Sequence, residues 1–398
     1  MPIIVQKYGG SSLATPAHIK QVAELIKQRL KTGVQLCIVV SAMGKNTNQL
    51  LALAHEISKN PIRRELDMLL SCGERASMAL LAMALDGLGV PSMSLTGSQS
   101  GIITDSTHSG AQIIEVRPSR VQEGLDQGKV VIIAGFQGVS INKEITTLGR
   151  GGSDTTAVAM AAALGADACE IYSDVAGVYS ADPRIIADPK HIEQLSYDHM
   201  LELASSGAKV LNAQAVQFAK LKNIEIKARK TGDERGETLI LNEASAFAKP
   251  SPFAKATGDK LADTAISIAV QEQLFCFAYE KTESLANLLN ALDQLDIKPS
   301  QIIGTNTGYC LVAPEDAHGL SKLVPPVGIS QMPDCASVSL IGNNLGNDMR
   351  VLSLALARMQ AMQVRVLGIT SSNLRLYFLI EPAKVHELVR ALYRENIQ

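Results

Sequence analysis

The chain has no tryptophan in its 398 residues, and aromatic residues make up only 4% of it. Proteins that hold single-stranded nucleic acid by stacking its bases need aromatic platforms. The formal net charge is −2, so the chain also lacks the basic excess that a phosphate backbone attracts. These two absences argue against nucleic acid as a partner.

The six cysteines stand apart, with no C-x-x-C pair among them, and the seven histidines are dispersed. This pattern suits neither a disulfide framework nor a zinc site, and it favours reduced, buried thiols. The N-terminus has no basic region followed by a long apolar run, and no uncharged apolar run of about 18 residues follows later. We therefore expect a cytoplasmic protein with no membrane partner and no metal held by protein ligands alone.

Several common active-site motifs are missing as well. The sequence contains no G-x-x-x-x-G-K-[ST], no G-x-G-x-x-G after the first expected strand, no G-x-S-x-G and no H-E-x-x-H. These absences exclude a P-loop, a dinucleotide fingerprint, a nucleophile elbow and a zincin site. If the chain binds phosphate, it must do so with another kind of loop.

What the chain does have is a globular composition, with 46% hydrophobic and 19% charged residues. Its length suggests two or three domains. Up to residue 240, short β-branched runs at 3–6, 37–40, 130–134, 169–172 and 225–228 predict strands. Helical patterns at 18–30, 66–85, 154–164 and 197–205 lie between them. This alternation predicts an α/β domain with a mainly parallel sheet, in which ligands bind at the carboxyl ends of the strands.

The composition changes near residue 241. Residues 242–263 are rich in Ala, Lys and Pro and repeat Phe-Ala-Lys, which predicts a flexible linker. Beyond it, strands are expected at 266–270, 301–305 and 309–312, with a helix at 283–295. A comparable block has strands at 336–341, 364–369 and 374–380 and helices at 349–362 and 383–395. Tandem modules of this size more often bind a regulatory ligand or form a dimer than carry out chemistry.

Lys7, Tyr8, Gly9 and Gly10 directly follow the first expected strand. Two adjacent glycines let backbone N–H groups approach an anion, and Lys7 adds a point charge that suits a phosphoryl group. The alternative is an ordinary turn that ends the strand beside a surface lysine.

A second glycine-rich stretch runs from Thr147 through Arg150 to Ser153 and Asp154 and leads into an Ala-rich helix. Free N–H groups at a helix N-terminus bind anions, and Arg150 could hold a carboxylate through two hydrogen bonds. The alternative is a capped helix whose glycines serve only the bend.

Three further features are ambiguous when taken alone. Residues 172–184 follow a strand with polar groups, a ring and an arginine, as a nucleotide site or a solvated loop would. Glu74 and Arg75 stand in an otherwise apolar helical stretch, where Glu74 either pairs with Arg75 or meets a ligand such as an ammonium group. Lys209 could reach a phosphate or remain in solvent.

Together these stretches resemble the aspartokinase family within the amino acid kinase superfamily. The motifs that carry the resemblance, in order and without large gaps over residues 1–240, are VQKYGGSS (5–12), VVSAMGKNT (39–47), LLSCGERAS (69–77), TGSQSGI (96–102), GFQGV (135–139), TTLGRGGSDTTAVA (146–159) and EIYSDVAGVYSADPR (170–184). The resemblance implies a three-layer αβα sandwich of the amino acid kinase type with a mainly parallel sheet, followed by two small βαββαβ-like ACT domains. It places the catalytic domain at 1–241, the linker at 242–263 and the ACT domains at 264–335 and 336–398.

The resemblance also implies an activity: ATP and L-aspartate give ADP and 4-phospho-L-aspartate, the first step toward lysine, threonine and methionine. ATP and Mg²⁺ are then the expected cofactors. The implied catalytic residues are Lys7, Asp154 and Lys209. The implied ATP contacts are Lys7, Tyr8, Gly9, Gly10, Ser173, Asp174, Tyr179, Arg184, Lys209 and Val210. The implied aspartate contacts are Ser41, Thr47, Glu74, Arg150 and Ser153, with Glu74 at the α-ammonium and Arg150 at the α-carboxylate.

The C-terminal blocks resemble paired ACT domains, which implies a homodimer or higher homo-oligomer through them and lysine or threonine as effector. Asn306, Thr370 and Ser371 match the effector-binding pattern, but the usual Pro-Gly turn is missing from both blocks. Position 176 is Ala where the family usually has Asp. These departures leave open whether feedback inhibition survives.

Two other functions compete with this one. A kinase for another acceptor, such as glutamate or UMP, would lack the combination of KYGGSS, GRGGSD and paired ACT blocks. A catalytically silent amino-acid-binding subunit would have no physical need for Lys7, Glu74, Arg150 and Asp154 together. We therefore expect a monofunctional aspartate kinase.

Overall fold

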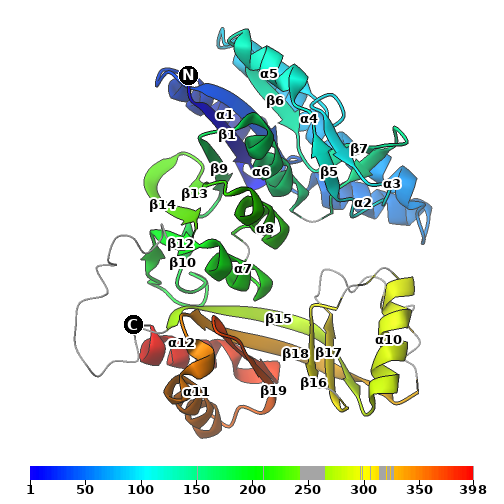
Figure 1. Cartoon of the computed structure of the whole chain (residues 1–398), viewed down its shortest axis with the longest axis vertical. Helices are drawn as coiled ribbons and strands as arrows, with labels where there is room; N and C mark the ends of the chain where they lie inside the picture. Colours follow the sequence, from blue (N-terminus) through cyan, green and yellow to red (C-terminus); the bar gives the residue numbers. More distant parts are fainter. Residues whose placement is uncertain are drawn as a thin grey trace. The chain divides into compact units, whose positions relative to one another are not determined.

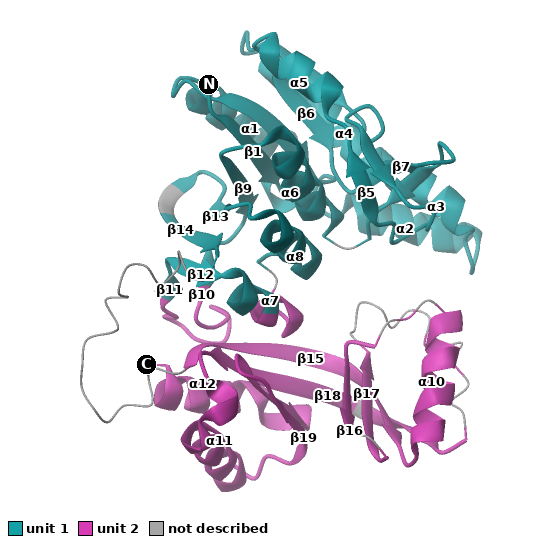
Figure 2. Ribbon diagram, in the orientation of Figure 1, with its two compact units in different colours: residues 1–178, 191–201, 209–249 teal, residues 179–190, 202–208, 250–398 magenta. Residues whose placement is uncertain are grey.

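The computed structural model describes residues 1–149, 151–208, 210–242, 265–295, 297, 299–304, 306–312, 320, 323 and 327–397 (Figure 1). Within these, the chain forms two compact units (Figure 2). Unit 1 takes its residues from 1–178, 191–201 and 209–249, and unit 2 from 179–190, 202–208 and 250–398. The predicted linker lies outside the described residues except for Asn242.

Unit 1 is built on an eight-stranded sheet with the order β12-β14-β13-β9-β1-β2-β6-β3. The bounds are β1 Ile3–Tyr8, β2 Gln35–Val40, β3 Ser92–Leu95, β6 Val130–Ala134, β9 Ala168–Ser173, β12 Gln194–Ser196, β13 Ile226–Lys230 and β14 Asp233–Leu241. From β13 to β3 every neighbouring pair is parallel, whereas β14 is antiparallel to β13 and parallel to β12, so β12 and β14 run opposite to the other six strands. The carboxyl ends of six strands therefore share one edge, where ligands bind in sheets of this kind.

Helices cover both faces of this sheet (Figure 1). On one face, α1 (Pro16–Leu30) and α4 (Cys72–Asp86) share a core with β1 and β2. On the other lie α5 (Ser119–Asp126), α6 (Gly152–Leu164) and α8 (Ala213–Lys222), α6 against β1, β2 and β9, α5 against β6 and α8 against α6. The remaining helices are α2 (Asn46–Ile57), α3 (Arg63–Leu70) and α7 (Tyr197–Ser205). The result is the predicted three-layer αβα arrangement.

Local sequence explains how α1 begins and which way it faces. Pro16 occupies its first turn, where a missing N–H costs nothing, and the Thr15 hydroxyl accepts from the His18 N–H at 3.3 Å. Its buried positions are Ile19, Val22, Ala23 and Ile26, which fall on one side of a helix of 3.6 residues per turn. Burying each such large apolar side chain contributes about 1.5–3 kcal/mol.

The helix predicted over 66–85 is divided. Ser71 ends α3 and begins α4; its N–H donates to the Asp67 carbonyl at 3.0 Å and its hydroxyl to the Met68 carbonyl at 2.8 Å. Among the described residues, the stretch Arg63–Asp86 is apolar and long enough by itself to cross a membrane, a test that core helices also pass. Its residues Met78, Leu81 and Leu85 pack in the core against α1 and the sheet.

A four-stranded sheet with the order β5-β4-β7-β8 extends unit 1. Its strands are β4 Ile102–Thr104, β5 Ile113–Val116, β7 Gln137–Ser140 and β8 Ile145–Thr147. Strand β8 ends where the glycine-rich loop begins, so this sheet fixes one end of that loop. The other end is the start of α6.

Unit 2 contains an antiparallel six-stranded sheet with the order β16-β17-β15-β18-β20-β19. Its strands are β15 Ala265–Tyr279, β16 Gln301–Gly304, β17 Gly308–Val312, β18 Ile329–Gly342, β19 Val366–Ser371 and β20 Arg375–Ile380. Helix α10 (Thr282–Gln294) packs near β17, and α11 (Met349–Ala361) and α12 (Val385–Asn396) pack on β18 and β20. The predicted strand–helix order of both blocks is confirmed.

Strand β15 belongs to both halves of this sheet. Residues 265–271 pair with β18, and residues 275–279 pair with β17 on one side and again with β18 on the other. The β15–β18 register shifts between Gln271 and Leu274, where Gln273 has φ 58°. The module boundary predicted between 335 and 336 falls inside β18, and the division into two modules remains a prediction.

Candidate active site

Lys7 and Asp154 form an ion pair at the carboxyl edge of the main sheet. The Lys7 Nζ lies 2.6 Å from Asp154 Oδ1, and the two side chains are only 12% and 10% exposed. Side chains alternate along β1, so Lys7 faces α6 while Tyr8 faces α1 and α4. The pair therefore joins the end of β1 to the first turn of α6, and it presents a cation at the edge where ligands bind.

The backbone after Lys7 runs close to the loop that follows β2. The Gly9 N–H donates to the Tyr172 carbonyl at 3.2 Å, and the Gly44 N–H donates to the Gly10 carbonyl at 2.9 Å. A Cβ on Gly10 would lie only 2.9 Å from the Ala42 carbonyl oxygen. Glycine at this position is therefore required for the two loops to meet.

The glycine-rich loop reaches α6 through Gly151, whose φ is 68°. A Cβ there would lie 2.3 Å from Asn212 Nδ2, so both the backbone angle and the packing call for glycine. Asn212 also donates its N–H to Asp154 Oδ2 at 3.3 Å and caps α8 through its side chain. The start of α6 is thus held by α8. Arg150 lies outside the described residues.

Glu74 is a carboxylate buried in the first turn of α4, with 3% of the residue exposed. Its Oε1 accepts from the Ala42 N–H at 3.1 Å, while its buried Oε2 has no hydrogen-bond partner within the described part of the chain. Burial raises the pKa of Glu74 from 4.5 to about 7, although the backbone hydrogen bonds oppose this rise.

The structure excludes one of the two alternatives for Glu74, the ion pair with Arg75. Arg75 donates its Nε to Gln137 Oε1 at 3.2 Å, and neither carboxylate oxygen of Glu74 takes it as partner. An unpartnered buried acceptor is costly unless a ligand completes it. Glu74 therefore has the environment of a residue that receives a cationic group.

The other predicted acceptor residues lie around the same edge. Ser41 directly follows β2, and its N–H donates to the Tyr8 carbonyl at 3.1 Å. Thr47 is in the first turn of α2 and is half-buried. Ser153 is 7% exposed, and its Oγ lies 2.8 Å from where a Cβ on Gly135 would be. Together with Glu74, these residues come from the end of β2 and the starts of α2, α4 and α6.

Of the predicted nucleotide contacts, Ser173 and Asp174 lie at the carboxyl end of β9. They line a cavity of about 190 Å³ together with residues that follow β1, lie on α1, or end or follow β13, namely Ser11, Ser12, His18, Gln21, Lys230 and Thr231. The Ser12 and Thr231 hydroxyls are 2.6 Å apart. The Tyr8 side chain is buried, stacks on Tyr172 with ring centroids 4.8 Å apart, and donates to Gln6. Only the backbone of Tyr8 remains for a nucleotide.

The remaining predicted nucleotide residues are divided between the two units. Tyr179 and Arg184 belong to unit 2, where Arg184 pairs with Asp182. That guanidinium lowers the pKa of Asp182. Val210 belongs to unit 1, and Lys209 lies outside the described residues.

The predicted effector residues lie in unit 2. Asn306 is exposed and accepts from the Thr282 hydroxyl at 3.0 Å, and the Thr370 hydroxyl accepts from Gln301 Nε2 at 2.9 Å. Ser371 ends β19. A separate cavity of about 390 Å³ is lined by residues of β15, β16 and β17 and the adjoining turn, including Tyr279, Gly304 and Tyr309.

Two polar residues at this edge were missed from the sequence. Asn212 gave no motif signal, because its role depends on a contact with Asp154, 58 residues earlier. Asp67 did give a sequence signal, because it is a carboxylate in the same expected helix as Glu74. In the structure it is fully buried. The rule that singled out Glu74 applies equally to Asp67.

Comparison with known proteins first defines the class. The model of the amino acid kinase family matches residues 2–228, which covers the sheet, the Lys7–Asp154 pair and Glu74. In fold, the whole chain resembles Escherichia coli aspartokinase III solved with aspartate and ADP, with a TM-score of 0.81 at 22% identity, covering 99% of both chains. Unit 1 thus has the fold of an amino acid kinase, and the chain belongs to that family.

Curated relatives then narrow the class. The chain is 39% identical to the aspartokinase of Mycobacterium tuberculosis over 402 residues, which covers 99% of this chain and 96% of the relative. Over 241 residues it is 52% identical to the aspartokinase of Corynebacterium glutamicum, covering 60% of this chain and 57% of the relative. The chain belongs to the aspartokinase family, and the resemblance carried by its motifs is confirmed.

Proposed function

We propose that the protein is an aspartate kinase that transfers the γ-phosphoryl group of ATP to the side-chain carboxylate of L-aspartate. The observation that carries the proposal is the buried Glu74, which lies in the same unit as the Lys7–Asp154 pair and whose Oε2 has no hydrogen-bond partner among the described residues. Glu74 at one end of the site is thus suited to bind an ammonium group, and Lys7 at the other end presents a cation. A free amino acid that is to be phosphorylated on a carboxylate brings both complementary groups.

The acceptor is held by its backbone groups. Glu74 receives the α-ammonium of aspartate, and Arg150 and the N-terminus of α6 receive its α-carboxylate. Ser41, Thr47 and Ser153 supply hydroxyls around it. With these groups fixed, the side-chain carboxylate points toward the edge where Lys7 lies.

The donor is held by the ends of β1 and β9. Lys7 and the N–H group of Gly10 contact the phosphates, while the Gly9 N–H is bonded to the Tyr172 carbonyl. Ser173 and Asp174, with Lys209 and Val210 of the same unit, bind the rest of the nucleotide. Tyr8 contributes only its backbone. Asp154 keeps Lys7 in place and is itself fixed by the Asn212 N–H.

The transfer needs no strong base, because the side-chain carboxylate of aspartate is already ionised near pH 7. One of its oxygens attacks the γ-phosphorus in line, the bond from that phosphorus to the β,γ-bridging oxygen breaks, and ADP leaves with the electron pair. Lys7, Lys209 and the loop N–H groups offset the charge that collects on the phosphoryl oxygens. The protein contributes mainly position and charge neutralisation.

Mg²⁺ is part of the proposal as the ion that enters with ATP and neutralises phosphate charge. Within the described residues, no group of three or more His, Cys, Asp or Glu side chains could hold a metal ion. That fits Mg²⁺, which keeps several waters and binds chiefly to phosphates with one or two carboxylates. Asp154 and Asp174 are the carboxylates of the site that could hold it.

The test measures ADP release that depends on aspartate, with the acyl phosphate trapped as its hydroxamate. We expect hydroxamate from the wild type and its loss in Lys7→Ala. Lys20→Ala removes an exposed lysine of α1 and should behave as the wild type. No hydroxamate from aspartate by a protein that still binds ATP would refute the proposal.

The same assay separates the competing functions. Glutamate as acceptor, followed by hydroxylamine trapping, and UMP as acceptor, followed by UDP formation, test the other kinases. A chain that binds aspartate and ATP but forms no product with any acceptor would be the silent subunit.

Unit 2 carries the regulatory part of the proposal. Two ACT-like modules, 264–335 and 336–398, form a homodimer, and lysine or threonine binds near Asn306, Thr370 and Ser371. A relative solved with lysine and aspartate, Escherichia coli aspartokinase III, has the same fold at a TM-score of 0.74. Adding each amino acid to the hydroxamate assay tests the effector, and light scattering tests the dimer.

A further inference from the structure

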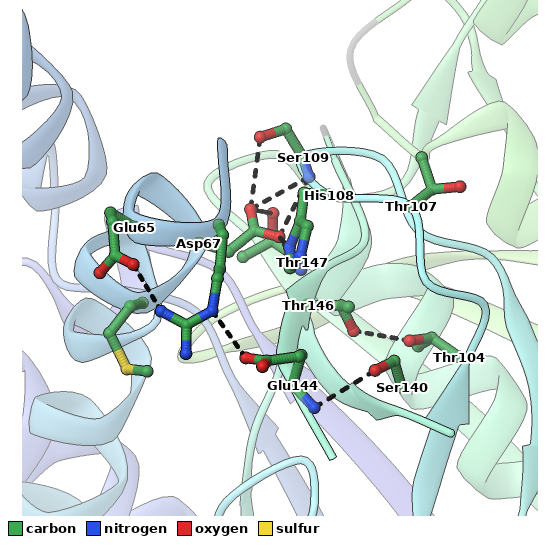
Figure 3. Close-up of polar contacts among 12 residues, drawn as sticks. Glu65, Asp67, Thr104, Thr107, His108, Ser109, Ser140, Glu144, Thr146 and Thr147 are labelled. Atoms are coloured by element: carbon green, nitrogen blue, oxygen red, sulfur yellow. Dashed lines mark hydrogen bonds and ion pairs between the residues drawn. The ribbon is translucent and has the colours of Figure 1, made fainter. Parts of the chain in front are cut away.

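Asp67 of α3 is a carboxylate with no exposed surface, and it is surrounded by hydrogen-bond donors (Figure 3). Its Oδ1 accepts from the Thr147 hydroxyl at 2.6 Å, and its Oδ2 accepts from the Thr147 N–H at 3.2 Å. The Ser109 N–H lies 3.1 Å from both oxygens, and the Ser109 hydroxyl lies 3.3 Å from Oδ1. His108 Nδ1 is 2.9 Å from Oδ2.

These contacts require an anion with two acceptor oxygens. The two backbone N–H groups can only donate, and the two hydroxyls also point toward the carboxylate. A carboxylate that accepts several such bonds can remain buried and charged. An asparagine at position 67 would turn an NH₂ group toward at least one of these donors, so it would fit the space but not the bonding.

The donors lie on two segments that meet behind the glycine-rich loop. Thr147 ends β8, and the next residue, Leu148, donates its N–H to the Phe136 carbonyl at 2.8 Å. The Ala111 N–H donates to the Thr147 carbonyl at 2.9 Å. A Cβ on Gly149 would be 3.6 Å from the Ser109 carbonyl oxygen. The segment around Ser109 therefore backs the loop, and Asp67 ties both to α3.

We propose that Asp67 is a positioning residue for the aspartate side of the site. It touches neither substrate; it fixes Thr147 and Ser109, and these hold Leu148 and Gly149, the start of the loop that leads to Ser153. The inference rests on the proposed function, in which this loop and Ser153 hold the acceptor. The proposed ATP contacts follow β1 and β9 instead. Loss of Asp67 should therefore weaken the binding of aspartate and leave the binding of ATP unchanged.

The chain offers a matched control in Asp105, a carboxylate in the connection between β4 and β5 that also contains Ser109. Its Oδ1 accepts from the Thr107 N–H at 3.1 Å and the Gln112 N–H at 3.3 Å, so among the described residues it bonds only within its own loop. Asp105→Asn removes a carboxylate that accepts backbone bonds without cutting the link to α3 and β8. A second pair is Thr147→Val, which removes the 2.6 Å bond at nearly constant shape, and Thr147→Ser, which keeps it.

The experiment measures kcat and both KM values in the hydroxamate assay, together with thermal unfolding. Asp67→Asn and Thr147→Val should raise the KM for aspartate on the order of tenfold or more, with the KM for ATP within about twofold of the wild type. Thr147→Ser and Asp105→Asn should keep both KM values. If Asp67→Asn does not fold, Thr147→Val still decides the matter, because it removes a single hydroxyl.

Three results would overturn the inference. An unchanged KM for aspartate in a folded Asp67→Asn or Thr147→Val is one. A parallel rise of both KM values, which a merely structural defect would cause, is another, and an equal effect of Asp105→Asn is the third. A wild type that makes no hydroxamate from aspartate would instead refute the proposed function, and the two failures are therefore distinct.

Discussion

Lys7 Nζ lies 2.6 Å from Asp154 Oδ1, and this contact links the end of β1 to the first turn of α6, far along the chain. The pair is mostly buried, so it is screened less than a surface ion pair would be. It holds the ammonium group at the edge where a phosphate would bind.

The first prediction concerns this pair. Lys7→Ala should lower kcat on the order of 10²–10³-fold, because it removes one preorganised charge from the transition state. Asp154→Asn should lower it by a smaller factor, and the double variant should lose little beyond Lys7→Ala, since both changes act on one interaction. Steady-state hydroxamate formation measures all three.

Asp167→Asn is the control for that series. Asp167 accepts from the Ile3 N–H at 2.9 Å, at the opposite end of β1, and is exposed. Its loss should leave kcat within about twofold, as expected for a surface contact. An Asp154→Asn variant that kept full activity would show that Lys7 needs no partner.

How far the sequence could lead is visible in these residues. Lys7 follows an expected strand and Ser153 precedes an expected helix, so the rule that ligands bind at carboxyl ends of parallel strands brings these two to one edge. Glu74 was expected inside a helix and was singled out as a charge in an apolar stretch. The αβα class and the family followed from the same motifs. In the structure, these motif residues lie near the carboxyl edge of the main sheet.

Other features depended on distant contacts that no local pattern shows. Asp67 meets Thr147 across 80 positions, and Glu74 meets the Ala42 N–H across 32. The break at Ser71 was also missed, because both α3 and α4 have helical composition and only the packing of each against a different neighbour divides them. Propensity is a weak guide wherever tertiary contacts decide.

The second prediction concerns pH and Glu74. Between about pH 4.5 and 7 the folded protein holds a proton on Glu74 that the unfolded chain has lost, because burial raises the folded pKa to about 7. The unfolded state binds fewer protons in this window, so the stability of the ligand-free protein falls as pH rises through it. Above pH 7 the full cost of the buried charge applies.

Glu74→Gln should therefore flatten this part of the stability profile and stabilise the ligand-free protein at pH 8 by about 1–3 kcal/mol. It should at the same time abolish binding of aspartate, whose ammonium group needs the ionised form. Thermal unfolding against pH and calorimetric titration with aspartate measure the two effects. A variant less stable than the wild type at pH 8 would contradict the account of Glu74.

The third prediction compares two glycines of α6. Gly151 has φ 68° and would bring a Cβ to 2.3 Å from Asn212, whereas Gly165 has φ 60° and nothing within 4 Å. Gly165→Ala should cost only the backbone strain of about 1 kcal/mol. Gly151→Ala should cost more and also reduce kcat, because Asn212 must move away from Asp154. Equal losses in unfolding midpoint and in kcat would argue against the contact.

The fourth prediction concerns a buried network on the opposite face of the sheet. Glu170 has no exposed surface and accepts from Gln6 Nε2 at 2.7 Å and from Arg29 Nη2 at 3.0 Å, with Arg229 Nη1 3.5 Å away. Glu170→Gln leaves two guanidinium groups without their shared carboxylate and should destabilise unit 1 by roughly 3–5 kcal/mol. Urea unfolding, followed by a probe in unit 1, measures it.

Glu237→Gln is the matched change, because Glu237 also pairs with Arg229 but its side chain is 38% exposed. An exposed pair of this kind contributes about 0–1 kcal/mol. If the two variants unfold at the same denaturant concentration, burial does not determine how much Glu170 contributes to the free energy of unfolding.

Strand β15 has a consequence for how this chain could change by recombination. Because residues 265–279 supply a pairing partner to both halves of the unit 2 sheet, and β18 does so from residue 329 to 342, neither half is a separable cassette. A crossover that exchanged only about the last sixty codons would fall within β18. Part of that strand would then pair with strands from a different parent sequence. We therefore expect the two halves of the unit 2 sheet to be inherited together. Regulatory specificity should change by point substitutions sooner than by recombination of one half.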